Sequence, residues 1–266
     1  MTGAQLATDV HMLPPVLCYH KVERRRELGV TRLSPRKFAT QVHSLAVAGW
    51  RGLTLSEFCA IVAGRRRPRA RELLITFDDA YRGLRDYAFP VLRDAGFGAA
   101  CFVITDYAGR LNRWDVAYGG RRFAHLTWRD IDRWHARGID FGSHTATHPR
   151  LPWIDDRRLD DELQRSRQAL AAALGAPASA IAYPFGSVSA REMLAATRAG
   201  YTVGFGVGGR WDNNPMVVPR APIHCWSPCL PVGGVQAWAA GLASVAAARC
   251  AVGTTLLRSL TRTASA

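Results

Sequence analysis

The chain has 266 residues, of which 48% are hydrophobic and 9% aromatic, so it can bury a large core and is neither disordered nor of low complexity. Its 35 Lys and Arg residues against 21 Asp and Glu residues give a formal charge of +14. The arginines are scattered, and no basic helix or RNA-binding signature occurs. We therefore interpret the charge as compositional and expect no nucleic acid partner.

The amino-terminal residues Met1 to Leu13 contain no basic stretch followed by an apolar one, so they do not resemble a secretory signal. The sequence therefore predicts a cytoplasmic protein with reduced thiols. Cys225 and Cys229 are spaced like half of a zinc site, but no second pair accompanies them. The other cysteines lie in apolar runs and are typical of buried thiols.

Strand-like apolar runs alternate along the chain with segments of helical periodicity. The expected strands are Val16–Tyr19, Leu73–Phe77, Ala99–Ile104, Ile139–Phe141, Ala180–Tyr183 and Tyr201–Phe205, with a last extended run at Met216–Pro219. The expected helices open at Ser34-Pro35 and span Tyr87–Ala95, Trp128–Ala136, Asp155–Leu174 and Ala190–Ala199. This alternation predicts an α/β fold with a mostly parallel sheet, either open or closed as a barrel.

The character of the sequence changes after residue 232. The stretch 233–266 has no Asp or Glu and is rich in Ala, Leu and Val. We therefore expect a catalytic domain over residues 1–232 and a helical tail over 233–266. The tail is too weakly apolar for a membrane span, which leaves packing on the barrel or peripheral attachment to a membrane surface.

The first segment with chemical potential is Thr76-Phe77-Asp78-Asp79, where two carboxylates end an apolar run. Active sites of parallel α/β folds gather at such strand ends. One carboxylate can hold a metal while the other handles protons, although Asp-Asp pairs also occur in solvated turns.

The second segment, 142–149, contains His144 and His148, which are four residues apart. On one helical turn both imidazoles would face the same way, which suits a divalent metal. The zincin pattern requires Glu after the first His, but Thr145 stands there, so Asp78 or Asp79 must supply a base. The third segment, Ala182–Gly186, predicts a turn that aims a backbone N–H into the cleft as an oxyanion donor.

The order T-F-D-D, G-S-H-T-x-T-H-P-x-L, A-Y-P-F-G resembles the polysaccharide deacetylase family, also called the NodB-homology family or carbohydrate esterase family four. Further matches occur at Tyr19–Val22, Ala88–Leu92, Ala99–Thr105 and Pro219–Pro222, and the resemblance covers the chain from about Val16 to His224. It implies a distorted (β/α) barrel of about seven strands and metal-dependent hydrolysis of the N-acetyl group of an amino sugar.

Matched position by position, the resemblance implies that Asp79, His144 and His148 bind the metal, usually zinc and sometimes cobalt or nickel. It also implies that Asp78 is the general base. The backbone N–H of Phe185 would support the oxyanion. His224 is the candidate general acid, with a structural histidine as the alternative.

The sequence departs from the family pattern at three positions. Ala80 stands where Gly is usual, a change that should be tolerated unless φ is positive there. Ala182 replaces an arginine that steadies the base, and Arg220 is expected to supply the missing guanidinium from the next strand. Phe185 replaces Tyr, which leaves its backbone donor intact.

Three further residues are candidates for contact with substrate. Tyr183 belongs to the same turn as Phe185. Trp114 could stack on a sugar ring or be a packed loop residue. His20 could support the cleft or belong to the core.

The expected partner is an N-acetylated glycan or glycoconjugate, whether polysaccharide, oligosaccharide or lipid-linked sugar. The alternatives are a deformylase or deacetylase of a cytoplasmic lipid-linked or small amino sugar, and a non-catalytic carbohydrate-binding relative. The presence of all three ligands and the base counts against the non-catalytic reading.

Overall fold

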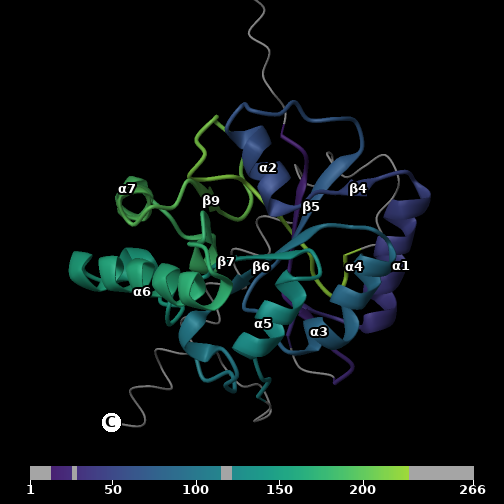
Figure 1. Ribbon diagram of the computed structural model, residues 1–266, viewed down its shortest axis with the longest axis horizontal. Coiled ribbons are helices and arrows are strands. Elements are labelled where there is room, and N and C mark those ends of the chain that lie inside the picture. The colour runs from purple at the N-terminus through teal and green to yellow at the C-terminus, as the bar shows by residue number, and fades with distance from the viewer. Residues whose placement is uncertain (1–12, 26–28, 115–121, 228–266) are drawn as a thin grey trace, which may run out of the picture.

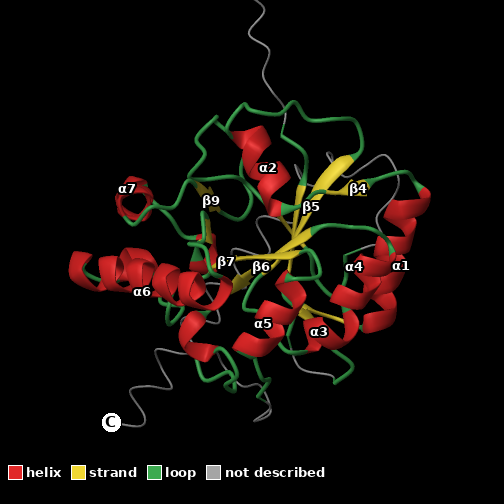
Figure 2. Ribbon diagram, in the orientation of Figure 1, coloured by secondary structure: helices red, strands yellow, loops and turns green. Residues whose placement is uncertain are grey.

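The strands form a curled parallel sheet with helices packed around it (Figures 1 and 2). The computed structural model describes residues 13–25, 29–114 and 122–227. Seven strands follow one another in the order β10-β1-β5-β6-β7-β8-β9, while β4 pairs with β5. Their bounds are β1 Val16–Tyr19, β4 Arg51–Gly52, β5 Glu72–Phe77, β6 Ala99–Val103, β7 Ile139–Ser143, β8 Ala180–Ala182, β9 Val203–Phe205 and β10 Ala221–Pro222. A separate pair joins β2 (Lys21–Val22) and β3 (Arg32–Leu33). The α/β class and the distorted barrel of about seven mostly parallel strands expected from the sequence are confirmed.

The two ends of the sheet are linked by backbone hydrogen bonds. The Gly206 N–H donates to the Val218 carbonyl and the Gly208 N–H donates to the Arg220 carbonyl, each at 2.9 Å. These bonds join the end of β9 to the segment that leads into β10. The extended run expected at Met216–Pro219 is therefore not a separate strand, because only Val218 bridges to β9.

Side-chain caps fix the starts of several helices. The Ser34 hydroxyl accepts from the Lys37 N–H at the start of α1, as expected, and Asp155 caps α6 in the same way. The helices are α1 Pro35–Val47, α2 Leu55–Val62, α3 Gly83–Tyr87, α4 Phe89–Asp94, α5 Trp128–His135, α6 Asp156–Leu174 and α7 Ala190–Arg198. Short 3₁₀ turns are η1 Thr105–Tyr107, η3 Leu151–Trp153 and η4 Pro184–Gly186.

Two helical regions differ from the sequence-based expectation. The helix expected at Tyr87–Ala95 is present as α4, but it begins later than expected, and the short helix α3 precedes it. Pro90 lies in the first turn of α4 and has no N–H to continue the earlier helix, so the two helices are separate. Helix α2 was not predicted. Its signal was a capping box, in which Thr54 and Glu57 bond each other's backbone N–H.

Alternating residues of the strands serve two separate cores, as a sheet covered on both faces requires. On β5, Leu73 and Ile75 pack with the surrounding helices, whereas Leu74 faces the interior of the curled sheet. The interior also contains Phe102 and Phe205, whose ring centroids are 5.2 Å apart. Polar groups at the carboxyl ends of the strands therefore lie above an aromatic floor.

Within the described part of the chain, no helix combines the length and the apolar character needed to cross a bilayer. The expected helical tail over residues 233–266, its alternative of membrane attachment and Cys229 lie outside the described residues.

The approach of Gly98 to the segment before α2 gives a test of the packing. A Cβ at this position would lie 2.6 Å from the Thr54 nitrogen and 2.7 Å from the Leu53 carbonyl oxygen. Gly98→Ala should therefore lower the free energy of unfolding by about 1–3 kcal/mol in urea titrations. Gly206→Ala is the control, because its Cβ would meet only Val217 at 3.5 Å. Equal losses in both variants would contradict the packing described.

Candidate metal centre

Three ligand-type side chains converge at the carboxyl edge of the sheet. Asp79 follows β5 and His144 follows β7, and both strands pair with β6. Asp79 Oδ1 lies 3.5 Å from His144 Nε2 and 3.6 Å from His148 Nε2, and all three side chains are buried. The structure thus brings together the three residues grouped from the sequence.

The spacing of these atoms suits a small cation. Ligand atoms about 2.0–2.1 Å from a tetrahedral ion stand roughly 3.3–3.4 Å from one another. The observed separations of 3.5 and 3.6 Å are close to that value. Two imidazoles and one carboxylate also form a donor set typical of zinc and related divalent metals. The residues therefore fit a divalent cation.

The two histidines converge through a loop and not through the helical turn expected from their spacing. Thr145 and His148 both have positive φ, at 66° and 61°. The Thr145 hydroxyl accepts from the His148 N–H at 3.0 Å. The N–H and hydroxyl of Thr147 both donate to the buried Glu162 of α6. Side-chain hydrogen bonds thus hold an otherwise unfavourable backbone.

A hydrogen bond to the backbone orients His144. Its Nδ1 lies 2.7 Å from the Ala182 carbonyl oxygen, which can only accept a proton. Nδ1 is therefore the protonated nitrogen and Nε2 keeps its lone pair toward Asp79. Burial lowers the pKa of His144, which favours the neutral imidazole that a metal requires.

Asp78 forms a buried, two-pronged ion pair with Arg220. The guanidinium donates to Asp78 Oδ1 at 2.7 Å and to Oδ2 at 2.8 Å, and it also donates to the Gly206 carbonyl at 2.9 Å. Arg220 is fully buried, 5.6 Å above the Phe102 ring centroid. The contact expected between Arg220 and Asp78, the first carboxylate of the Asp78-Asp79 pair, is thus present in the structure.

The ion pair keeps Asp78 charged. Burial alone would raise the pKa of the Asp78 carboxyl, but the charge of Arg220 and its hydrogen bonds outweigh burial and hold that pKa well below the usual range. Asp78 therefore stays ionised through the physiological pH range.

The turn after β5 is strained. Asp79 has φ of 69° and Ala80 has φ of 52°. Ala80, where Gly is usual in the family, thus has a positive φ. This is the condition under which the change from Gly was expected not to be tolerated without cost. Such a conformation costs a non-glycine residue roughly 1–2 kcal/mol. The burial of Ala80 and the bond from the Leu126 N–H to its carbonyl, 2.8 Å long, help to hold this turn.

A second cluster surrounds Asp78. Ligand-type atoms of Cys18, His20 and Asp78 lie within 4.8 Å of one another, and the Cys18 thiol is 3.5 Å from Asp78 Oδ2. Burial raises the pKa of Cys18 well above its usual value, so the thiol stays protonated and donates to the carboxylate. Because Asp78 is already committed to Arg220, we interpret this cluster as support for that carboxylate. His20 thus lies at the site, as one of its two sequence-based readings expected.

Aromatic rings flank His148. The Trp114 ring centroid lies 3.9 Å from that of His148, and the Phe185 centroid lies 4.7 Å away. Trp114 is 5% exposed and also packs in a small cluster with Tyr81, Ile104 and Phe123. Trp114 therefore covers the proposed metal ligand His148 and does not present a free ring face on which a sugar could stack.

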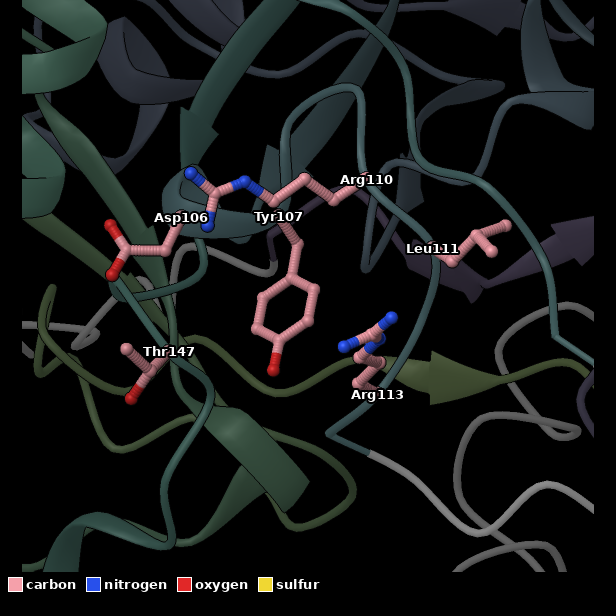
Figure 3. Close-up of a pocket in the computed structure, with 6 residues that line it drawn as sticks. All are labelled: Asp106, Tyr107, Arg110, Leu111, Arg113 and Thr147. Atoms are coloured by element: carbon pink, nitrogen blue, oxygen red, sulfur yellow. The ribbon is translucent and has the colours of Figure 1, made fainter.

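A cavity of about 390 Å³ opens beside the loop that joins His144 to His148 (Figure 3). Its size falls within the range of small-molecule sites. The lining residues come from η1, from the loop that follows it and from the loop between His144 and His148. They are Asp106, Tyr107, Arg110, Leu111, Arg113 and Thr147. The cavity reaches the loop between His144 and His148 through Thr147, and none of the three ligand-type residues lines it.

The turn after β8 places Phe185 and Tyr183 differently. Phe185 has φ of 61°, and bonds from the Gly186 N–H to the Tyr183 carbonyl and from the Ser187 N–H to the Pro184 carbonyl fix the turn. The Tyr183 side chain is fully buried, and burial, with smaller contributions from Glu192 and Tyr201, raises the pKa of its hydroxyl. Its hydroxyl thus belongs to the core and is not brought to the metal ligands.

His224 lies two residues after β10, at the same level as His20, which follows the neighbouring β1. It is 5% exposed, and its ring packs 5.1 Å from that of Trp226. Burial lowers its pKa. The structure therefore places His224 at the same edge of the sheet as the metal ligands, where burial favours its neutral form.

Sequence reasoning missed two supporting residues. Glu162 lies on the buried face of α6, where a carboxylate among leucines signals a structural or functional partner. His125 Nδ1 bonds the Asp79 carbonyl, so it supports the backbone of a proposed ligand. Its loop position carried no sequence pattern.

Comparisons with known proteins show what the chain is similar to. A family profile described as polysaccharide deacetylase matches residues 65–204. The poly-beta-1,6-N-acetyl-D-glucosamine N-deacetylase of Staphylococcus epidermidis is 25% identical over 211 residues, which are 71% of this chain and 70% of that protein.

Solved structures show the same fold. IcaB from Ammonifex degensii superposes with a TM-score of 0.69 at 27% identity, covering 85% of this chain and 97% of IcaB. The Streptococcus pyogenes deacetylase PplD, solved with acetate, gives a TM-score of 0.70 at 22% identity, covering 81% and 94% of the two chains. The second likeness concerns the fold alone.

Replacing Arg220 tests the buried ion pair. Arg220→Leu leaves Asp78 charged in an apolar interior, so the free energy of unfolding should fall by about 3–5 kcal/mol in urea titrations. Asp78→Asn combined with Arg220→Leu should recover part of this loss, since no charge then remains buried. Strictly additive losses from the two single substitutions would show that the pair is not coupled.

His125 makes the stability of the metal-free protein depend on pH. Burial lowers its pKa to about 4, so between pH 6.5 and 4 the unfolded chain binds a proton that the folded chain does not. The free energy of unfolding should therefore fall as the pH drops through this window, with roughly 3 kcal/mol or less from this residue.

The check is urea unfolding of chelator-treated protein at pH 7 and pH 5. His125→Asn should weaken the pH dependence, whereas the exposed His43→Gln should preserve it. An identical pH dependence in His125→Asn and the unsubstituted protein would refute the assignment.

Proposed function

The chain belongs to the polysaccharide deacetylase family, and from this premise we propose that it hydrolyses the N-acetyl group of an N-acetylhexosamine unit in a glycan. Acetate and a free amine are the products. The observation that carries the proposal is the convergence of Asp79, His144 and His148 beside the Asp78–Arg220 pair.

We assign metal binding to Asp79, His144 and His148, with zinc as the proposed ion and cobalt or nickel as substitutes. When bound, a divalent cation polarises the amide carbonyl and lowers the pKa of water. The support from this chain is the donor set, its spacing, and the bond that keeps the lone pair of His144 Nε2 available.

Asp78 is the proposed general base. Arg220 fixes both of its carboxylate oxygens and keeps the group ionised, so it can accept a proton from the attacking water. A carboxylate with so low a pKa is a weak base, so it depends on a water molecule that has itself been made more acidic. Cys18 and His20 contact or neighbour this carboxylate and would hold its orientation.

The other roles follow from position. The Phe185 backbone N–H is the proposed oxyanion donor, because the turn of η4 sets Phe185 against His148. His224 is the proposed acid for the leaving amine. Since burial favours its neutral form, it would first have to acquire a proton.

The substrate class is proposed from the relatives. The Staphylococcus epidermidis relative is named as acting on poly-beta-1,6-N-acetyl-D-glucosamine. We propose a β-linked N-acetylglucosamine glycan for this chain, with the sugar beside the 390 Å³ cavity.

Acetate release from β-1,6- and β-1,4-linked N-acetylglucosamine oligomers tests the function. Zinc-loaded protein should release acetate, and a chelator should abolish the release. Asp78→Asn should lower kcat by about 10²–10⁴-fold, because it removes the base and keeps the three ligands. Metal analysis should find its zinc content unchanged.

His148→Ala should lose both zinc and activity, whereas His43→Ala, at an exposed position on α1, should lose neither. Full activity in Asp78→Asn would contradict the role of the base. Full zinc content in His148→Ala would contradict the ligand set.

A further inference from the structure

A row of stacked groups leads from the metal centre to the protein surface. The His148 ring centroid is 4.7 Å from that of Phe185, the Arg150 guanidinium carbon is 4.8 Å from the Phe185 centroid, and the same carbon is 4.9 Å from the Trp153 centroid. The row ends in the solvent, since Trp153 is 66% exposed.

This exposure sets Trp153 apart from most large apolar side chains of the described residues. Burying such a ring would stabilise the protein by roughly 2–3 kcal/mol. Isolated exposed hydrophobic residues are common and need no explanation. Val47 and Leu194, at 74% and 62% exposure, are of this kind, because neither is stacked on a row of rings. Trp153 differs because its ring is held in a defined orientation. Through Arg150 it connects to Phe185, which packs against the proposed metal ligand His148.

The orientation of Trp153 has two causes. It is the last residue of η3, where its N–H donates to the Arg150 carbonyl at 2.9 Å. The Arg150 side chain then stacks on one ring face as a cation–π contact. These two contacts hold the Trp153 ring in place although it is not buried. The rest of the ring surface stays open to a ligand.

The chemistry of the row favours a neutral pyranose ring as its occupant. One face of a β-linked hexose carries several C–H groups and is apolar, while its hydroxyls point outward to donors such as a guanidinium. An exposed indole with a polar neighbour matches that pattern, because aromatic rings recognise ligands that have one apolar face and a wet edge. A long aliphatic ligand would need a broader apolar surface than one ring.

We infer that Phe185, Arg150 and Trp153 form a sugar-binding subsite for a unit of the glycan other than the one that is deacetylated. The inference rests on the proposed function and extends it, because it makes an oligomer or polymer the preferred substrate over a monosaccharide. Trp153 supplies the stacking surface, and Arg150 positions its ring.

Chain-length dependence tests this subsite. For zinc-loaded protein, kcat/KM for acetate release should rise from the N-acetylglucosamine monomer to the pentamer. Trp153→Ala should lower kcat/KM for the pentamer by about tenfold, a loss equivalent to about 1.4 kcal/mol, and should flatten the dependence on length. The loss should be mainly in KM, since the substitution removes binding and not chemistry.

Two variants control for general effects. Trp153→Phe keeps an aromatic face and should recover most of the length dependence. Leu194→Ala truncates a comparably exposed side chain on α7 and should match the unsubstituted protein at every length. A pentamer-to-monomer ratio in Trp153→Ala equal to that of the unsubstituted protein would overturn the subsite while leaving the deacetylase function in place.

Binding without turnover separates the two proposals. A β-1,6-linked glucose pentamer has no amide to cleave, and its contact with zinc-loaded protein can be followed by saturation-transfer NMR. We expect binding that weakens in Trp153→Ala and persists in Leu194→Ala. If no N-acetylated glycan is cleaved but this binding pattern holds, the deacetylase proposal fails and the subsite stands. Binding that is absent, or is unaffected by loss of Trp153, overturns the subsite.

Discussion

The buried ion pair between Arg220 and Asp78 connects the elements on which the candidate site depends. Asp78 follows β5, and Arg220 precedes β10, on the opposite side of β1. The same guanidinium bonds the Gly206 carbonyl, and the Gly208 N–H bonds the Arg220 carbonyl where the two ends of the sheet are linked. One side chain therefore fixes the carboxylate, contributes to closure of the sheet and occupies the space above Phe102.

Such a pair has a large desolvation cost, which only good geometry can offset. Two short parallel hydrogen bonds and a third bond to a carbonyl supply that geometry. Two hydrophobic side chains of equal volume can stabilise a fold as well as such an ion pair does. Stability alone therefore does not explain why Asp78 and Arg220 are charged residues. Their position beside Asp79 and His144 explains them better, because a fixed negative charge is useful where a cation and a water molecule must be oriented.

The sequence predicted the proposed metal ligands better than it predicted the residues that hold the neighbouring carboxylate in place. Asp79, His144 and the turn at Phe185 each follow a strand, and the carboxyl ends of parallel strands share one edge, so their convergence could be expected from the order of motifs alone. Arg220 was predictable because Ala182 cannot supply a guanidinium. The role of Cys18 was not, since a cysteine in an apolar strand looks the same whether or not a carboxylate lies 3.5 Å away.

Other differences have physical reasons. The spacing of His144 and His148 suggested a helical turn, but hydrogen bonds accepted by the Thr145 hydroxyl and the Glu162 carboxylate hold a positive-φ loop that spacing cannot reveal. Tyr183 was grouped with the substrate-facing residues, yet its ring lies in the core, because neighbouring residues of an extended segment point to opposite faces. The direction of a single side chain depends on packing that no local pattern records.

The ligand distances of the bound metal test the central claim most directly, because two clusters at this edge could compete for one ion. X-ray absorption of zinc-loaded protein should show only nitrogen and oxygen neighbours at about 2.0–2.1 Å, including two imidazoles, as Asp79, His144 and His148 require. A sulfur neighbour at about 2.3 Å would place the ion with Cys18 and His20 and would contradict the assignment.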